Sequence, residues 1–263
     1  MISIMRYGEV ANEQVFARSV PEVDVAGIVK GIVDDVRARG DAALKDYCLK
    51  FDKVSLDALE VTEDEIDAAI NAVEPEFIAV LEKAAANIRH FHEKQVRQSF
   101  IIADREGVVM GQKITPLDRV GLYVPGGTAA YPSTVLMDAI PALIAGCGEI
   151  VITTPPARDG SVNPAILAAA KVAGVHRVFK VGGAQAIAAL AYGTESIPCV
   201  DKIVGPGNAF VAEAKKQVFG RVAIDMIAGP SEILIVADGR SDPSTWRRTC
   251  SPRPSTTSWP ARY

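Results

Sequence analysis

The sequence predicts an α/β fold: a parallel β-sheet covered by helices on both faces. Two observations carry this prediction. From about residue 119 onward, short apolar runs alternate strictly with Ala-rich stretches of helical length, which is typical of β-α-β units. Glycine-rich turns separate several of these runs from the helices that follow them. With 49% hydrophobic and 23% charged residues over 263 positions, the composition is that of an ordinary globular protein with a sizeable core.

The first segment, residues 1 to about 118, is expected to be mostly helical and charged. Apolar residues from Val25 to Val36 recur at the i, i+3, i+4 spacing of an amphipathic helix. Thr62 and Glu65 form a capping box, which marks the start of a helix. The further elements expected here are helices over about 63–72 and 75–95, and strands around 100–102 and 108–110 joined by a polar turn at 104–107.

The alternating segment that follows is expected to supply the parallel sheet. Its apolar runs are short and its helices are rich in alanine, so the strands are predicted to be buried between two helical layers. The expected elements are strand 120–124, helix 134–147, strand 150–153, helix 164–173, strand 177–181, helix 184–192, helix 209–219 and strand 233–236.

The final segment, residues 240–263, differs from everything before it. It contains no Leu, Ile, Val or Phe, but it holds both tryptophans, four prolines, five arginines and nine Ser or Thr residues. Because such a segment has no periodic apolar face to bury, we expect it to be disordered.

Three glycine-rich turns lie where α/β proteins bind ligands, at the carboxyl ends of strands and the amino ends of helices. They carry Tyr123, Gln185 and Asn208. Gln185 falls in the first turn of a helix, whose positive dipole end favours an anion. Asn208 can hydrogen-bond a ligand or cap the next helix. A fourth turn presents Ser231 and Glu232, as a binding site or as a plain capped turn.

Each of these turns also has a purely structural interpretation, because glycine adopts positive φ angles freely and often follows a strand for that reason. Three of them in one alternating segment nevertheless favour a nucleotide or cofactor crevice. The G-x-G-x-x-G dinucleotide fingerprint does not occur in the sequence, so the expected site lacks the usual pyrophosphate loop.

Charge and composition argue against several classes of partner. A net charge of −4 provides no broad basic surface for nucleic acid. No apolar run reaches the roughly 18 to 20 residues that cross a bilayer, and no leader is evident, so we expect no membrane partner and a cytoplasmic location. The four cysteines are scattered and are expected to be reduced, and His90, His92 and His176 are expected on the surface rather than at a metal.

Six segments between Val120 and Asp238 resemble histidinol dehydrogenases, which oxidise L-histidinol to L-histidine in two NAD-dependent steps. They include the runs VGLYVPGG and DKIVGPGNAFV. Such long matches in the same order make the resemblance specific, whereas the first 118 residues are only compatible with it. The matching segments are Val120–Gly127, Ser133–Met137, Val181–Ala191, Gly193–Ser196, Asp201–Val211 and Ala228–Glu232.

The resemblance implies a role for four residues. Tyr123, Gln185 and Asn208 would contact NAD, and Ser231 would touch the substrate. It also implies a homodimer whose subunits contain two incomplete Rossmann-like domains, the nucleotide-binding one inserted in the other. Here the divisions would be 1–118 for the first part of the outer α/β domain, 119–232 for the inserted domain, 233–239 for a return strand and 240–263 for the tail.

The family also uses a zinc ion and a Glu-His acid/base pair, which it places beyond the matching segments. We therefore expect no catalytic residue and no metal ligand in this sequence. Residues Trp246 to Thr257 can be encoded so that a neighbouring frame reads Val-Ala-Ala-Asp-Leu-Leu-Ser-Gln-Ala-Glu-His-Asp, which contains the family's zinc motif. Our hypothesis is a shift of reading frame near residue 240, which leaves the C-terminal half missing and the 263-residue chain inactive.

Three alternatives remain open at this stage. In the first, the chain is a non-enzymatic NAD-binding or dimerisation fragment. In the second, it is a remnant that folds poorly because its sheet is unfinished. The third is an acyl-transfer or aldehyde-oxidising enzyme of related architecture. No cysteine lies in a turn suited to a covalent intermediate, which disfavours the last of these.

Overall fold

A computed structural model describes residues 25–126 and 130–227, together with positions 10, 11, 240, 242 and 244. Residues 26–228 form one compact unit; residues 1–25 and 229–263 are assigned to a second unit, of which almost nothing is described. The expected strand at 233–236 and Ser231 lie outside the described residues, as do all positions of the segment 240–263 except 240, 242 and 244, so that strand and the expected disorder of the tail stay predictions.

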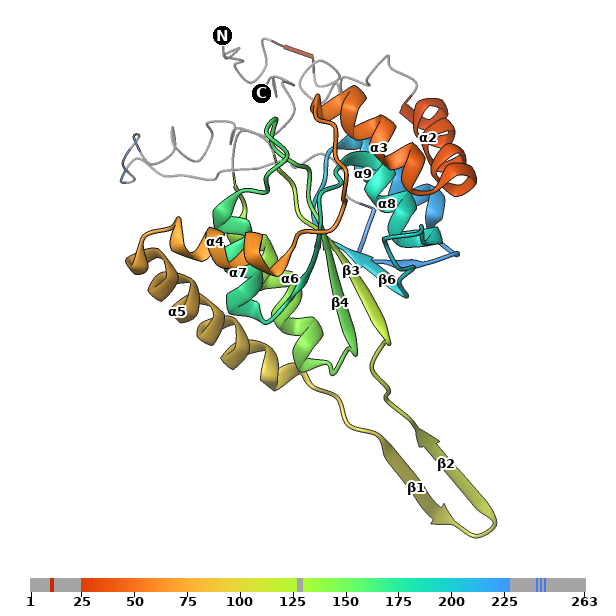
Figure 1. Cartoon of the computed structure of the whole chain (residues 1–263). Coiled ribbons are helices and arrows are strands. Elements are labelled where there is room, and N and C mark those ends of the chain that lie inside the picture. Colours follow the sequence, from red (N-terminus) through yellow and green to blue (C-terminus); the bar gives the residue numbers. More distant parts are fainter. Residues whose placement is uncertain are drawn as a thin grey trace. The chain divides into compact units, whose positions relative to one another are not determined.

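A five-stranded parallel sheet forms the centre of the unit 26–228 (Figure 1). Its order is β5-β4-β3-β6-β7, and every neighbouring pair is parallel. Strands added in sequence therefore build outward from β3, first to one side and then to the other. The prediction of an α/β fold with a parallel sheet is confirmed. The strands are β3 (Arg119–Tyr123), β4 (Glu149–Thr153), β5 (Arg177–Phe179), β6 (Lys202–Val204) and β7 (Ala223–Ile224).

Helices cover both faces of this sheet in two separate layers (Figure 1). In one layer, α6 packs on α7, and both contact α5; in the other, α8 packs on α9 and also contacts α3. A Cβ atom at Gly121 of β3 would lie 2.9 Å from Leu190 Cδ2, so α8 approaches the sheet closely there. The sheet helices are α6 (Pro132–Ile144), α7 (Pro164–Ala173), α8 (Gly183–Tyr192) and α9 (Ala209–Val218).

The first segment folds over the same unit. Leu59 and Val61 pair antiparallel with the residues of and just after β5, through Lys180 N–H to Leu59 O at 2.7 Å and Val61 N–H to Val178 O at 2.8 Å. The segment 59–61, which precedes the sheet in the sequence, is thus hydrogen-bonded to the β5 edge of the sheet. The elements are α2 (Val25–Arg39), α3 (Asp41–Tyr47), the π-helix η1 (Cys48–Asp52), α4 (Glu63–Asn71), α5 (Pro75–His92) and the 3₁₀ turn η2 (Glu93–Gln95).

The expected capping box at the start of α4 is present. Thr62 Oγ1 accepts from Glu65 N–H at 3.2 Å, and Glu65 Oε2 accepts from Thr62 N–H at 2.8 Å. We expect Thr62→Ala to lower the free energy of unfolding by about 1 kcal/mol, because one N–H of the first turn loses its acceptor. Urea unfolding measures this loss, and Thr62→Ser, which keeps the hydroxyl, should be close to neutral. Equal losses in the two variants would contradict the capping role.

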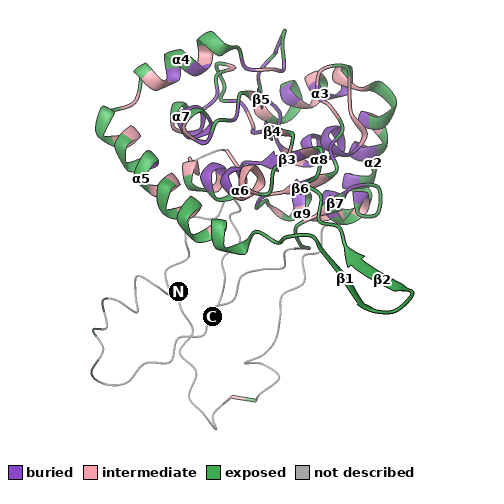
Figure 2. Ribbon diagram, turned by 90° about the horizontal axis from the view of Figure 1, so that it is seen from below, coloured by how far each residue is buried: buried purple, intermediate pink, exposed green. Residues whose placement is uncertain are grey.

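A separate β-hairpin lies in the sequence between the helical first segment and the strands of the parallel sheet. Strands β1 (Phe100–Arg105) and β2 (Val108–Gln112) pair antiparallel, as expected, and Gly107 in the turn has φ +75°. Every residue of both strands is exposed, as the green ribbon in Figure 2 shows. The hairpin therefore adds nothing to the buried core, which lies around the five-stranded sheet.

The predicted boundaries were wrong at three places. The helix expected at 134–147 begins at Pro132, because proline fits the first helical position, and it ends before Gly146, where φ is +83°. The strand expected at 177–181 ends at Phe179. Short elements that the apolar pattern did not indicate are α3, η1, β6 and β7, which have two to seven residues each.

Candidate functional site

The turns that follow β3, β5 and β6 interlock at the carboxyl edge of the sheet. Tyr123 ends β3, and its Oη accepts a hydrogen bond from Gly183 N–H, at the start of α8, at 3.1 Å. Gly205, just after β6, has φ +118°, and a Cβ atom there would lie 2.1 Å from Tyr123 O. Tyr123 is therefore in contact with both other turns, one through its phenol and one through its backbone.

The glycines of these turns serve packing between protein segments. A Cβ atom would lie 2.6 Å from Pro155 Cγ at Gly126, and 2.5 Å from Pro155 Cβ at Gly182. At Gly207 it would lie 2.2 Å from Val211 Cγ1. The structural interpretation of these turns thus explains the glycines, and close approach of a ligand is not required to account for them.

The structure brings the sequence-predicted residues Tyr123, Gln185 and Asn208 to this one edge. Tyr123 and Gln185 are 4% and 3% exposed, so a ligand reaches only a small part of either side chain as they stand. Asn208 is half-buried and caps α9, with Oδ1 accepting from Phe210 N–H at 3.0 Å and Val211 N–H at 3.1 Å. Both roles considered for Asn208 are compatible with this geometry, since the cap uses only its oxygen.

Gln185 is unusual among these residues because its side-chain amide takes part in no hydrogen bond within the described part of the chain, although the residue is 3% exposed. Its helix, α8, has Gly182 at the N-cap and no side-chain cap. The Gln185 amide atoms are not among the fully buried polar atoms that lack a partner, so the amide keeps a small contact with solvent through which water or a ligand can satisfy it. The start of α8 therefore offers an unused amide beside the positive end of a helix dipole.

Asp52 is a group near this edge that the sequence analysis missed. It ends the π-helix η1, and its buried Oδ2 has no hydrogen-bond partner in the described residues. Burial raises the pKa of Asp52 to about 6. Burial also raises the pKa of Tyr123, with a smaller contribution from the negative charge of Asp52. A π-helix often marks a functional position, but nothing in the apolar pattern revealed one here.

A second overlooked group lies beside the turn after β6. Lys215 of α9 has a side chain only 5% exposed; its Nζ donates to Gly205 O and to Asp225 Oδ1, both at 2.6 Å. Asp225 Oδ2 in turn accepts from Gly205 N–H at 3.0 Å. The ion pair thus holds the peptide groups on both sides of Gly205. A lone lysine in an amphipathic helix gave no signal of this role.

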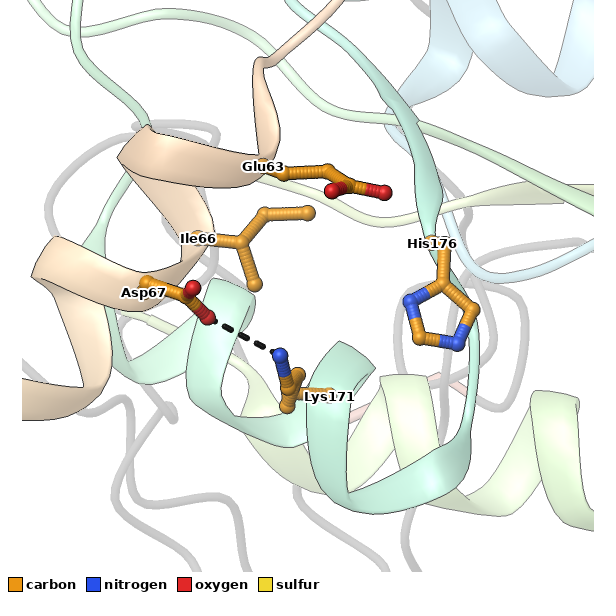
Figure 3. A pocket seen from close by; sticks show the side chains of 5 residues that line it. All are labelled: Glu63, Ile66, Asp67, Lys171 and His176. Carbon is orange, nitrogen blue, oxygen red and sulfur yellow. Dashed lines mark hydrogen bonds and ion pairs between the residues drawn. The ribbon is translucent and has the colours of Figure 1, made fainter.

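A small pocket on the other side of β5 is unrelated to this edge (Figure 3). It measures about 120 Å³ and lies where α4 faces α7, with Glu63 and His176 on opposite walls. Lys171 Nζ and Asp67 Oδ1 form an ion pair at 2.9 Å in its floor. Because His176 directly precedes β5, this pocket lies at the amino end of that strand, where α/β folds do not usually place ligands.

The described residues include no group of three or more His, Cys, Asp or Glu side chains arranged to hold a metal ion. His90 and His176 are exposed, as expected, and His92 is half-buried, with Nδ1 2.7 Å from Gln95 Oε1. Within the same part of the chain, none of the helices has the length and hydropathy needed to span a bilayer. The zinc ion that the resemblance implies therefore has no site among these residues.

Several curated proteins are similar to this chain. A histidinol dehydrogenase of Clostridium acetobutylicum is 54% identical over 249 residues, which cover 92% of this chain and 58% of that protein. One of Lactiplantibacillus plantarum is 58% identical over 230 residues, covering 88% of this chain and 54% of that protein. The chain thus spans little more than half the length of these relatives.

A solved structure gives the same result. The crystal structure of histidinol dehydrogenase from Elizabethkingia anophelis superposes with a TM-score of 0.82 at 44% identity, over 88% of this chain and 54% of that one. The histidinol dehydrogenase family model matches residues 17–246, which is most of the sequence. By both sequence and fold, this chain belongs to the histidinol dehydrogenase family.

Proposed function

We propose that the carboxyl edge of the sheet binds NAD, and that this chain supplies the nucleotide-binding part of an enzyme that oxidises L-histidinol to L-histidine. The observation that carries the proposal is the meeting of Tyr123, Gln185 and Asn208 at one edge, where open α/β sheets bind ligands. Each comes from a different βα turn, so a single ligand at this edge is within reach of all three turns.

The donor and acceptor groups of the edge suit a dinucleotide. Gly183 N–H donates to Tyr123 Oη, but the N-cap Gly182 provides no side-chain cap, so the rest of the first turn of α8 offers backbone N–H groups and a positive dipole end to a phosphate. Gln185 adds an amide without a partner in the described residues, and Asn208 retains its amide nitrogen beside the α9 cap. NAD would act as the hydride acceptor when bound, while these residues bind and orient it.

The remaining parts of the proposal rest on family membership alone. We infer Ser231 as a substrate contact, a homodimer as the assembly and the cytoplasm as the location. The division into an outer domain and an inserted domain at about 119–232 is also proposed. The described residues include no group of side chains that would hold a zinc ion. For the 263-residue chain as it stands, NAD binding without turnover is the alternative outcome that the same edge supports.

The first test is a titration of the folded chain with NAD, in which binding is measured by isothermal titration calorimetry. We expect saturable binding, and we expect Gln185→Leu to weaken it about 3- to 10-fold, because an amide that hydrogen-bonds the nucleotide is lost without a large change in volume. Addition of L-histidinol with spectroscopic detection of NADH reports turnover separately from binding.

Gln217→Leu is the matched control. Gln217 lies on α9, where its amide donates to Ala26 O at 2.9 Å and to Glu213 Oε1 at 3.0 Å, away from the proposed site. We expect NAD affinity to be unchanged in this variant. If the wild-type chain fails to bind NAD, or if both glutamine variants bind it equally well, the proposed role of the edge is wrong.

A further inference from the structure

The pocket beside the turn after β6 lies at the point where the sheet reverses its direction of growth. It measures about 210 Å³ and is lined from three elements: Asp138 of α6, the turn Gly205–Gly207 with α9, and Asp225 after β7. The helix α6 follows β3 on one face and α9 follows β6 on the other, and β3 and β6 are neighbours. Crevices at such switch points are the usual ligand sites of open α/β sheets.

Asp138 is the one acid of this pocket whose charge is not matched. Lys215 and Asp225 already satisfy each other, and Asp225 also accepts from Gly205 N–H and Met226 N–H. Asp138 Oδ2, in contrast, is buried and has no hydrogen-bond partner in the described residues. Burial raises the pKa of Asp138 to about 6, with Asp225 adding to the shift and Lys215 opposing it.

We propose that this pocket is a subsite for a sugar ring, and that Asp138 accepts a hydrogen bond from one of its hydroxyl groups. The inference rests on the proposed function, because the ribose of a nucleotide at the same edge is the sugar in question. A pocket of about 210 Å³ is below the roughly 300 Å³ of sites that enclose whole drug-sized ligands, so it suits one part of a larger molecule.

The residues that line the pocket favour a hydroxyl group over a phosphate, a metal ion or an amine. A phosphate would be repelled by the unmatched Asp138 carboxylate, and a metal ion or an amine would face the Lys215 ammonium in the same wall. A hydroxyl satisfies the carboxylate without adding charge. Pro206, Val211 and Ala212 supply apolar contact for the ring carbons.

The experiment is a thermodynamic cycle that compares the binding of adenosine and its deoxy analogues to two proteins. Adenosine and 2′-deoxyadenosine are titrated into the wild-type chain and into Asp138→Leu, with 3′-deoxyadenosine as a third ligand to identify the hydroxyl. In the wild type, we expect loss of one hydroxyl to weaken binding about 10-fold or more, since hydrogen bonds to charged groups are the stronger ones. In Asp138→Leu, the ligands with and without that hydroxyl should bind equally.

Asp67→Leu, on α4 beside the small pocket of Figure 3, is the control acid, and it should leave the difference between the ligands intact. Equal binding of all three adenosines by the wild type overturns the inference even if NAD binds, which leaves the proposed function standing.

A second measurement covers the case in which no adenosine binds. Carbon-detected NMR of the Asp138 carboxyl follows its titration near pH 6 with and without D-ribose. Hydrogen bonding to the charged form lowers its pKa, so a downward shift on addition of ribose supports the subsite, while the separate titration with NAD decides the proposed function. An unchanged titration at high ribose concentration, together with no adenosine binding, overturns the subsite.

Discussion

Gly205→Ala is expected to destabilise the chain by about 4 kcal/mol or more, or to prevent folding altogether. The φ angle of +118° at this position is unfavourable for any residue with a side chain, and the added Cβ would lie 2.1 Å from Tyr123 O. The obstacle is backbone at the end of a central strand, so it cannot be relieved by a change of rotamer. Separation of β6 from β3 is the only relief, and that breaks the middle of the sheet.

Gly174→Ala provides the matched control for this experiment. Gly174 has φ +80°, in the left-handed region, and no atom lies within 4 Å of a Cβ atom built there. Its replacement should therefore cost only the conformational penalty of about 1 kcal/mol. Urea unfolding of both variants gives the comparison. Similar midpoints for the two would show that the contact with Tyr123 is not a constraint on the fold.

Most of the fold was predictable because most of its strands are short and mainly apolar, and glycine-rich turns follow several of them. The strand 150–153 and the helix 164–173, for example, were found within one residue of their ends. The elements that the apolar pattern could not reveal are short, and some of them form only through contacts with residues far away in the sequence. The two-residue strand β7 exists through pairing with β6, and α3 is only seven residues long. Local periodicity carries too little signal for elements of that length.

The candidate site was predictable to a smaller extent. Position after a strand was enough to select Tyr123, Gln185 and Asn208, and the parallel topology then brings them to one edge. It could not show that Tyr123 and Gln185 are almost completely buried. Nor could it select Asp138, which lies within α6, where an acid at one position of an amphipathic helix is usually solvated.

The ion pair that fixes the turn after β6 leads to the second large effect. We expect Lys215→Met to lower the free energy of unfolding by about 3 kcal/mol, because the Asp225 carboxylate would be left without its counterion and Gly205 O without its donor. The loss should be below the upper end of such effects, since the Asp225 side chain is 30% exposed and partly solvated.

Two further variants separate the ion pair from general damage to α9. Lys216→Met, one residue on, removes an exposed lysine that pairs with Glu213 at 3.5 Å, and it should cost less than about 1 kcal/mol. Lys215→Met combined with Asp225→Asn should recover more than half of the single-variant loss, since the amide oxygen can still accept from Gly205 N–H. If the double variant is instead less stable than Lys215→Met alone, the penalty comes from lost packing of the lysine stem rather than from an unpaired carboxylate, and the turn is held by contacts other than this pair.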